Sequence, residues 1–424
     1  MPSPAKSLRE LSCADDYDPN SMAVAKAREF IQAYLNPITG TEKVNIRAAL
    51  GRVLAEDIIS PFNVPAHVNS AMDGYAVRFK DLNASGETVL RLAGIAFAGK
   101  PYTGKVSEKE CVRIMTGAVL PQGTDTVIMQ EHARAQGHDI RFDAGHKQGQ
   151  NIRQAGEDLA IGQVVLKTGK HIRPAELGLI ASLGIAEITV HRRLRVAFFS
   201  TGDELRSIGS LLEEGQIYDS NRYTIYGMLR RLGAEVLDMG VVKDDPASLE
   251  RALSEAAATA DVVITSGGVS VGEADYIKEL LSRLGEVVFW KIAMKPGRPL
   301  AYGKIGQAHF FGLPGNPVSV MVTFYQFVRE ALLILMGRKD DYAIPTLKAT
   351  CVSALKKAPG RTEFQRGILS RDTNGTWSVR VTGEQGSGIL RSMSEANCFI
   401  ILPESQGNVA PGTLVEVQVL NGLV

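Results

Sequence analysis

Three glycine-bearing polar segments, each following an apolar run, are the places in this sequence where ligand chemistry is easiest to envisage. LRVAFFS leads into residues 200–204, DVVITS into residues 266–275, and HFFGL into residues 314–319. Glycine lets backbone N–H groups approach an anion closely, and the start of a following helix adds a positive dipole end. In an open α/β sheet such loops meet beyond the carboxyl ends of the strands, which predicts a phosphate-bearing ligand. One such loop alone could be an ordinary turn between a strand and a helix.

The predicted substrate-binding residues come from these loops and from one basic residue expected near them. They are Thr201, Gly202, Ser266, Gly267, Gly268, Ser270, Gly272, Pro314, Gly315, Asn316 and Arg298.

Acidic residues beside glycine or at predicted strand ends form a second group. Clustered carboxylate oxygens suit Mg²⁺, which keeps water and substrate phosphates as its other ligands. A turn or a helix cap explains each of these residues equally well, and Asp275 could simply favour the dipole of the helix that follows it. The group comprises Asp73, Asp158, Glu204, Asp244 and Asp275.

Basic residues gather in the segments KIAMKPGRP and FQRG. Lys291 and Lys295 are predicted on one strand, four residues apart, so both side chains are expected on the same face. Arg298 follows a Pro-Gly turn, and Arg366 belongs to a later strand. Cations fixed in this way can bind an oxyanion, although solvated strand ends are an alternative interpretation.

Two common nucleotide-binding motifs do not account for the loops. The Walker A pattern GxxxxGK[ST] is absent from the sequence. The segment GEQGSG at 383–388 resembles a dinucleotide-binding motif but precedes no helix of a βαβ unit, so we expect a hairpin or loop there.

The elements that must position these residues change character along the chain. Residues 21–35 are predicted as a helix, and short strands alternate with turns from residue 63 to about residue 150, as in a small β-rich domain. From Arg195 onward, apolar strands alternate with helical segments, which predicts an open doubly wound α/β sheet. After Pro345, short alternating strands between Gly, Asn and Pro predict a small β-barrel or sandwich.

Composition excludes several classes of protein. The 424 residues include 47 Lys+Arg and 46 Asp+Glu, so the net charge of +1 gives no general attraction to nucleic acid or an acidic membrane. The apolar stretch 318–336 is interrupted by Gln326, Arg329 and Glu330, which predicts a core helix and not a membrane span. The four cysteines form no CxxC pair and the N-terminus lacks an apolar signal core, so a cytoplasmic protein is expected.

Taken together, these segments resemble the MoeA family of molybdopterin molybdenumtransferases, which includes the C-terminal domain of gephyrin. The resemblance runs from about residue 21 to the C-terminus. Its motifs are NSAMDGYAV (69–77), TGAVLPQGTDTVIMQE (116–131), AGEDL (155–159), STGDEL (200–205), SGGVSVGEADY (266–276), KIAMKPGRPLAYG (291–303) and LPGNPVS (313–319).

The resemblance implies a multidomain α/β architecture with four domains after a flexible N-terminal arm. The implied divisions are an arm at 1–20, an elongated dimerisation domain from 21–62 and 152–192, an inserted β-rich domain at 63–151, a doubly wound molybdopterin-binding α/β domain at 193–340, and a C-terminal β-barrel at 341–424.

The resemblance also implies a reaction in molybdenum cofactor biosynthesis. Adenylated molybdopterin and molybdate would be the substrates, and molybdenum transfer would release AMP with the help of Mg²⁺. A homodimer with composite active sites is implied, as are contacts with other proteins of the pathway. By motif, the catalytic residues would be Asp73, Thr116, Asp158, Asp244, Lys291, Lys295, Arg366 and Ser387, and the metal-binding residues Glu204, Asp275 and Asp158.

Two other functions compete with this interpretation. An adenylyltransferase that makes the adenylated pterin would need little beyond residues 193–340, so NSAMDGYAV and the barrel segments count against it. Consumption of ATP would favour it. A scaffold or clustering protein is the second alternative, and the full acidic and basic set argues against a purely structural role.

Overall fold

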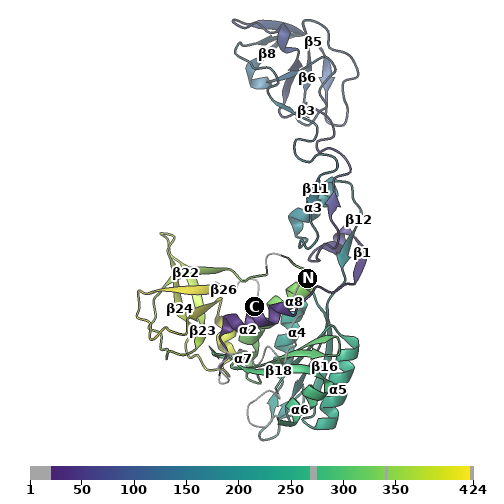
Figure 1. The fold of residues 1–424 in the computed structure, drawn as a ribbon. Coiled ribbons are helices and arrows are strands. Elements are labelled where there is room, and N and C mark those ends of the chain that lie inside the picture. The colour runs from purple at the N-terminus through teal and green to yellow at the C-terminus, as the bar shows by residue number, and fades with distance from the viewer. Residues whose placement is uncertain (1–20, 268–274, 340–341, 421–424) are drawn as a thin grey trace, which may run out of the picture.

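The protein is described by a computed structural model that covers residues 21–267, 275–339 and 342–420. Figure 1 shows an elongated molecule with a β-sheet unit at one end and an α/β unit beside a β-barrel at the other. A narrow connecting region lies between the two ends.

The unit at the far end is a six-stranded sheet in the order β7-β4-β6-β5-β9-β8. Alternate residues of a strand point to opposite faces, so Tyr75 and Val77 pack in one small core and Ala76 in another. The strands are β4 (Gly74–Val77), β5 (Thr88–Ala96), β6 (Glu110–Ile114), β7 (Thr126–Met129), β8 (Ala133–Gln136) and β9 (Asp139–Phe142), with 3₁₀ turns at Phe79–Asp81 and Gln130–His132.

The connecting region consists of two segments of the chain, one that leads to the far-end unit (outgoing) and one that leads back from it (returning). Each outgoing strand pairs antiparallel with a returning one, and α3 packs on the small core that they form. The pairs are β1 (Thr41–Asn45) with β12 (Glu187–His191) and β2 (Ile58–Ile59) with β11 (Val164–Leu166); the helices are α3 (Pro174–Ser182) and a 3₁₀ turn at Ile46–Ala49. A third pair, β3 (Asn69–Ser70) with β10 (Ile152–Arg153), lies where the connecting region meets the far-end unit.

The α/β unit contains a six-stranded sheet in the order β16-β13-β17-β21-β20-β18. The first four strands are parallel, and β20 and β18 complete the sheet in antiparallel pairs. The strands are β13 (Arg195–Thr201), β16 (Glu235–Val242), β17 (Val262–Ser266), β18 (Gly285–Lys291), β20 (Pro299–Ile305) and β21 (Ala308–Leu313).

Helices cover both faces of this sheet. Phe198 and Ile264 belong to the core shared with α4, α7 and α8, whereas Phe199 and Val263 belong to the core shared with α5 and α6. The helices are α4 (Ser220–Leu232), α5 (Pro246–Thr259), α6 (Asp275–Leu284), α7 (Pro317–Thr323) and α8 (Arg329–Leu335), with a π-helical segment at Phe324–Val328 and the N-terminal α2 (Val24–Ala33) packed beside it. A small parallel pair, β14 (Leu205–Arg206) and β15 (Ile217–Tyr218), follows β13.

One continuous helical stretch, Pro317–Leu335, is long and apolar enough to cross a membrane by length and composition alone. Because 89% of its most apolar window is buried inside the protein, it is the core helix that the sequence predicts.

The C-terminal unit is a β-barrel. Its strands run in the order β23-β24-β22-β26-β25, and β25 pairs back with β23, which closes the ring; β19 adds to the edge of β23. The strands are β19 (Met294–Lys295), β22 (Thr346–Cys351), β23 (Thr362–Arg371), β24 (Trp377–Val381), β25 (Cys398–Leu402) and β26 (Leu414–Val419), with a short helix α9 (Arg391–Glu395). The predicted multidomain α/β architecture with a C-terminal barrel is therefore confirmed.

Candidate functional site

The three glycine-bearing loops meet at one edge of the α/β sheet. Ser200 is in register with Ser266 on the neighbouring strand, and Ser266 is in register with Leu313 on the next. The loops that begin at these positions therefore leave the sheet side by side. Gly268, Ser270 and Gly272 lie outside the described residues, so the structure places only the first part of the middle loop.

The crevice at this edge is a topological switch point. From β13 the chain passes through α4 to β16, which flanks β13 on one side, whereas β17 flanks it on the other. The helices that follow β13 and β17, α4 and α6, lie on opposite faces of the sheet, so the loops after these two strands diverge. Open α/β sheets bind ligands at such a point, beyond the carboxyl ends of the strands.

Gly267 makes the close approach between the loops possible. Its φ is +94°, in the left-handed region, and a Cβ atom there would lie 2.4 Å from the carbonyl oxygen of Thr201. Only glycine fits both the conformation and the space. The site thus depends on glycine here for a physical reason and not merely as a turn residue.

Acidic groups border the same crevice. The hydroxyl of Thr201 donates to Asp244 Oδ1 at 3.3 Å. The Glu204 carboxylate lies against Gly202: a Cβ atom added to Gly202 would be 2.7 Å from Glu204 Oε2. Asp275 is the first residue of α6, and its side chain lies outside the described residues.

A loop of the barrel reaches the third glycine-bearing loop. The backbone N–H of Val318, in the first turn of α7, donates to the carbonyl of Ser387 at 3.0 Å. Residues 383–388 form a loop there, as predicted. The barrel therefore contributes Ser387 to the surroundings of the Pro314–Asn316 segment.

Arg366 anchors the barrel loop at residues 383–388 through hydrogen bonds. Its side chain is fully buried, with Nε donating to Ser392 Oγ at 3.0 Å and Nη2 donating to the carbonyl of Gly386 at 3.0 Å. Burial removes water from the guanidinium and lowers its pKa to about 10, so the group remains charged at neutral pH. In this arrangement the charge orders the loop that carries Ser387.

The two lysines do not share a strand, so that expectation is wrong. Lys291 ends β18 opposite Pro299, at the same edge of the sheet as the glycine-bearing loops, with Arg298 immediately before Pro299. The chain then leaves the sheet, and Lys295 pairs with the barrel strand β23, where its Nζ lies 3.4 Å from Glu363 Oε1. Tertiary pairing with the barrel overrides the apparent continuity of the segment.

Asp73, Thr116 and Asp158 lie away from this edge within the same chain. Asp73 immediately precedes β4 of the far-end sheet, and its Oδ1 accepts from both the backbone N–H and the hydroxyl of Thr116 at 2.7 Å. These donors, the N–H first, hold the pKa of the exposed Asp73 carboxyl below its ordinary value. Asp158 is exposed in the connecting region. Figure 1 shows the far-end unit at a distance from the α/β unit, with the connecting region between them.

The described residues contain no cluster of three or more His, Cys, Asp or Glu side chains able to enclose a metal ion. At the edge of the α/β sheet where the glycine-bearing loops meet, the described carboxylates are those of Glu204 and Asp244. Two carboxylates suit an ion such as Mg²⁺ that takes water and substrate phosphates as its remaining ligands. They do not suit a dedicated protein cage.

Asn221 is a residue of this site that the sequence did not single out. It lies in the first turn of α4 and donates from Nδ2 to Ser266 Oγ at 2.9 Å and to the carbonyl of Gly315 at 2.6 Å. An asparagine near a helix start is common in any protein, so its type and position alone gave no signal.

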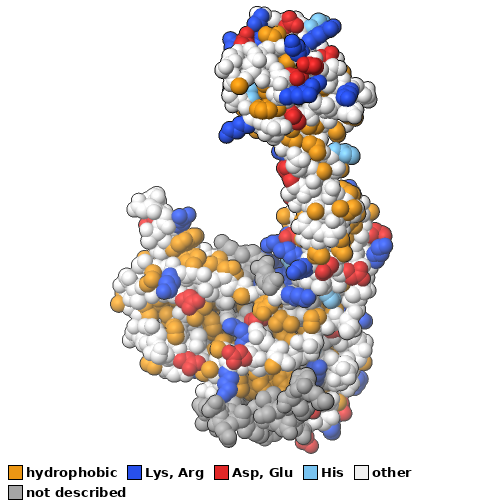
Figure 2. Space-filling model, turned by 45° about the horizontal axis from the view of Figure 1, so that its top comes forward, with side chains coloured by type: hydrophobic (Ala, Val, Ile, Leu, Met, Phe, Trp, Pro, Cys, Tyr) orange, Lys and Arg blue, Asp and Glu red, His pale blue; other side chains and the backbone are white. Residues whose placement is uncertain are grey.

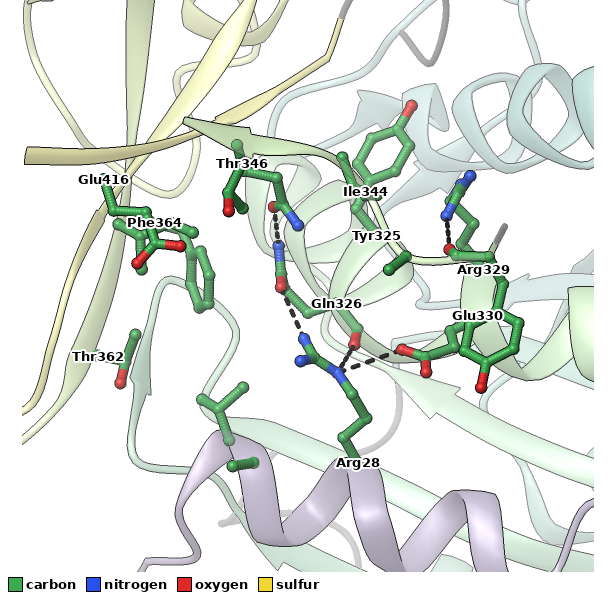
Figure 3. A pocket seen from close by; sticks show the side chains of 16 residues that line it. Arg28, Tyr325, Gln326, Arg329, Glu330, Ile344, Thr346, Thr362, Phe364 and Glu416 are labelled. Atoms are coloured by element: carbon green, nitrogen blue, oxygen red, sulfur yellow. Dashed lines mark hydrogen bonds and ion pairs between the residues drawn. The ribbon is translucent and has the colours of Figure 1, made fainter. Parts of the chain in front are cut away.

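A cavity of about 320 Å³ lies elsewhere, between α2, the Phe324–Leu335 segment and the barrel (Figure 3). Three hydrogen-bonding contacts link polar side chains around it: Arg28 bonds to Gln326 and pairs with Glu330, and Gln326 donates to Gln418. None of the predicted catalytic, substrate-binding or metal-binding residues lines this cavity.

Comparison with known proteins places the chain in a family. Residues 22–184 match the MoeA N-terminal region (domain I and II), 197–333 a probable molybdopterin binding domain, and 348–420 the MoeA C-terminal region (domain IV). A molybdopterin molybdenumtransferase from Haemophilus influenzae is 49% identical over 91% of this chain and 95% of its own length. The chain belongs to the MoeA family.

Other MoeA relatives agree with that assignment. A gephyrin from Dictyostelium discoideum is 33% identical over 88% of this chain and 59% of its own length. The crystal structure of the molybdopterin biosynthesis MoeA protein from Pyrococcus horikoshii OT3 has a TM-score of 0.82 and 30% identity, covering 94% of this chain and 100% of its own. The predicted family and its transferase class are confirmed, and MoeA proteins act in molybdenum cofactor biosynthesis.

Proposed function

We propose that this chain transfers molybdenum from molybdate to adenylated molybdopterin and releases AMP. The observation that carries the proposal is that three polar loops leave the sheet together at the switch point, with Asp244 and Glu204 beside them and the basic residues Lys291 and Arg298 at the same edge of the sheet. Such an edge offers backbone N–H groups to phosphates, and cations to a tetrahedral oxyanion.

Each group of the chain has a distinct task in this proposal. The Thr201, Ser266 and Gly315 loops bind the pterin and its phosphates. Lys291 and Arg298 orient molybdate beside the dithiolene group of molybdopterin, which receives the molybdenum. Ser387 closes the site from the barrel side. The individual assignments follow the motif positions, and the hydrogen bonds described above support them.

Mg²⁺ fits this donor set through Glu204 and Asp244, with Asp275 as a further candidate ligand. Bound there, it would neutralise charge on the phosphoanhydride and make AMP a better leaving group. The chain's own contribution is to hold the carboxylates at the edge of the sheet, where Thr201 donates to Asp244.

We further propose a homodimer whose active sites combine two chains, with Asp73, Thr116 and Asp158 supplied by the partner. The far-end unit, which carries Asp73 and Thr116, is separated from the α/β unit within one chain, and this supports the proposal (Figure 1). Exposed apolar side chains also support an interface between copies. They lie on α4 and in the segment from β14 to β15: Ile208, Leu211, Ile217, Tyr223 and Tyr226.

The proposed domain divisions and location follow the same reasoning. We propose boundaries near residues 62, 151, 192 and 340, because the strand pairings change from one sheet to another close to these positions. Cys111, Cys351 and Cys398 are free and buried, which suits a reducing cytoplasm. On the face in Figure 2, cationic and anionic side chains are mixed over the far-end unit, which offers no single-sign surface for nucleic acid.

The test is incubation of the purified protein with adenylated molybdopterin, molybdate and Mg²⁺ while AMP is measured. We expect AMP release that requires both molybdate and Mg²⁺. A parallel reaction with molybdopterin and ATP tests the adenylyltransferase alternative. ATP consumption there, with no molybdate-dependent AMP release from the adenylated substrate, would overturn the proposal.

A further inference from the structure

Asn221 joins three elements beneath the switch point. Its side chain, 9% exposed, extends from the first turn of α4 toward the end of β17 and the loop after β21. Nδ2 donates to Ser266 Oγ at 2.9 Å and to the Gly315 carbonyl at 2.6 Å. The hydroxyl of Ser266 in turn lies 3.4 Å from the carbonyl of Pro314.

The orientation of this amide is fixed by chemistry. The Gly315 carbonyl can only accept a hydrogen bond, so the atom that faces it must be the amide nitrogen. Both hydrogens of Nδ2 are then committed, one to each loop. The side chain therefore acts as a two-pronged donor between the β17 and β21 loops.

Stability alone does not explain the residue. Asn221 Oδ1 is buried and has no hydrogen-bond partner among the described residues. An unsatisfied buried acceptor costs free energy that offsets the gain from the two donated bonds. What the residue contributes at the crevice is therefore its pair of donated hydrogen bonds.

The two loops contact each other directly where Asn221 holds them. A Cβ atom at Gly315 would lie 4.0 Å from the Cα of Gly267, and the N–H of Gly267 donates to the carbonyl of Leu313 at 3.2 Å. A shift of either loop would thus change the spacing between Gly267 and Gly315 at the crevice.

We propose that Asn221 is a positioning residue that sets the spacing of the β17 and β21 loops for the ligand that bridges them. This inference rests on the proposed function for the identity of that ligand, adenylated molybdopterin.

The first test compares Asn221→Ala with Asn221→Asp in the AMP-release assay. Alanine removes both donated bonds, and we expect KM for adenylated molybdopterin to rise about 10-fold with kcat changed less than about threefold. The carboxylate of Asn221→Asp keeps the size of the side chain but faces the Gly315 carbonyl with a second acceptor. We expect Asn221→Asp to raise KM about 100-fold. If Asn221 only filled space, Asn221→Ala would raise KM more than Asn221→Asp.

A pH profile separates the donor role from packing. Below its pKa, the introduced carboxyl of Asn221→Asp carries a proton and can donate to the Gly315 carbonyl. The ratio of KM in this variant to KM in Asn221→Ala should therefore fall as pH is lowered. A constant ratio, together with an alanine variant indistinguishable from wild type, would overturn the inference.

Backbone amide exchange tests the inference without any ligand. Asn221→Ala should speed hydrogen exchange at Gly267 by about 10-fold or more relative to wild type. Asn408→Ala is the matched control, because it removes a hydrogen bond of 2.9 Å to the N–H of Lys357 in the barrel. It should leave Gly267 unchanged, and unchanged exchange in both variants would overturn the positioning role.

The outcomes also separate the two proposals. A wild-type protein that releases no AMP defeats the proposed function, and Gly267 exchange then decides the role of Asn221 alone. If Asn221→Ala fails to fold, Ser266→Ala removes one of the two bonds, and we expect a KM increase of about threefold. A Ser266→Ala variant with wild-type KM and exchange would count against the inference.

Discussion

At the scale of single residues, two hydrogen bonds join Asp73 to Thr116, which are both proposed active-site residues. The residues are 43 positions apart, yet one carboxylate oxygen accepts two hydrogen bonds from the same threonine. Hydrogen bonds to the charged form favour ionisation, which is why the pKa of this exposed carboxyl lies below its ordinary value. The motif positions identified both residues, but only the fold shows that one holds the other.

Replacing Thr116 by valine should shift the pH dependence of the reaction. Valine keeps the backbone N–H but removes the hydroxyl donor, so the pKa of Asp73 rises. Protonation then occurs at higher pH, and the acid limb of kcat/KM moves upward. The measurement is the pH profile of AMP release. Thr124→Val is the control, because its hydroxyl donates to the Pro121 carbonyl and not to Asp73; equal profiles for all three proteins would contradict the prediction.

At the scale of elements, the sequence predicted strands and helices well where local signals were strong. The helix at Pro246–Thr259 begins with an Asp245 cap and a proline in its first turn, and both signals are local. The prediction of one strand for both lysines was wrong because distant segments set where the strand ends: Ala293 N–H donates to the carbonyl of Met22, and Thr362 N–H donates to the carbonyl of Ala293. Asn221 was missed for the same reason, since its partners come from β17 and β21.

Gly267→Ala should disable the crevice more than backbone strain alone can explain. Its added Cβ would lie 2.4 Å from the Thr201 carbonyl, so one loop must move. We expect affinity for adenylated molybdopterin to fall at least about 10-fold, as measured by equilibrium dialysis without molybdate. Gly306→Ala shares the positive φ, at +57°, but its Cβ meets nothing within 4 Å. Equal loss in both variants would trace the effect to strain and refute the steric argument.

Glu176 should stabilise the start of α3 in a pH-dependent way. Hydrogen bonds led by the Arg173 side chain lower its pKa from 4.5 to about 2. Because the folded-state value is depressed, the stabilisation is complete above about pH 4.5 and is lost as pH falls toward 2.

Glu176→Gln tests this linkage by urea unfolding at several pH values. We expect the variant to be less stable by about 2 kcal/mol at pH 7, with the difference shrinking below pH 4.5. Glu187→Gln is the control, because its ion pair with Lys43 is exposed and should contribute little. A difference that is independent of pH would contradict the linkage.

At the scale of the whole molecule, the elongated shape restricts where a complete active site can form. Asp73 and Thr116 lie in loops of the far-end unit, just before β4 and just after β6, whereas Asp244, Ser266 and Lys291 lie at the edge of the α/β sheet. Figure 1 shows these two units at opposite ends of the molecule. The antiparallel pairs of the connecting region separate these parts within each chain. If all of these residues serve one reaction, a second copy must supply the missing set. A two-fold dimer then carries two equivalent composite sites.

Complementation between two inactive variants tests this arrangement. Asp73→Ala and Asp244→Ala should each be nearly inactive as homodimers. In a mixed dimer one site carries both substitutions and the other carries neither, so a purified mixed dimer should regain about half of wild-type activity. Random reassembly from equal amounts should restore about a quarter, because about half of the dimers are mixed. The measurement is AMP release by dimers that carry two different tags, with subunit mixing verified by mass. A mixed dimer as inactive as its parents would mean that each site is built within one chain, with the far-end sheet acting elsewhere.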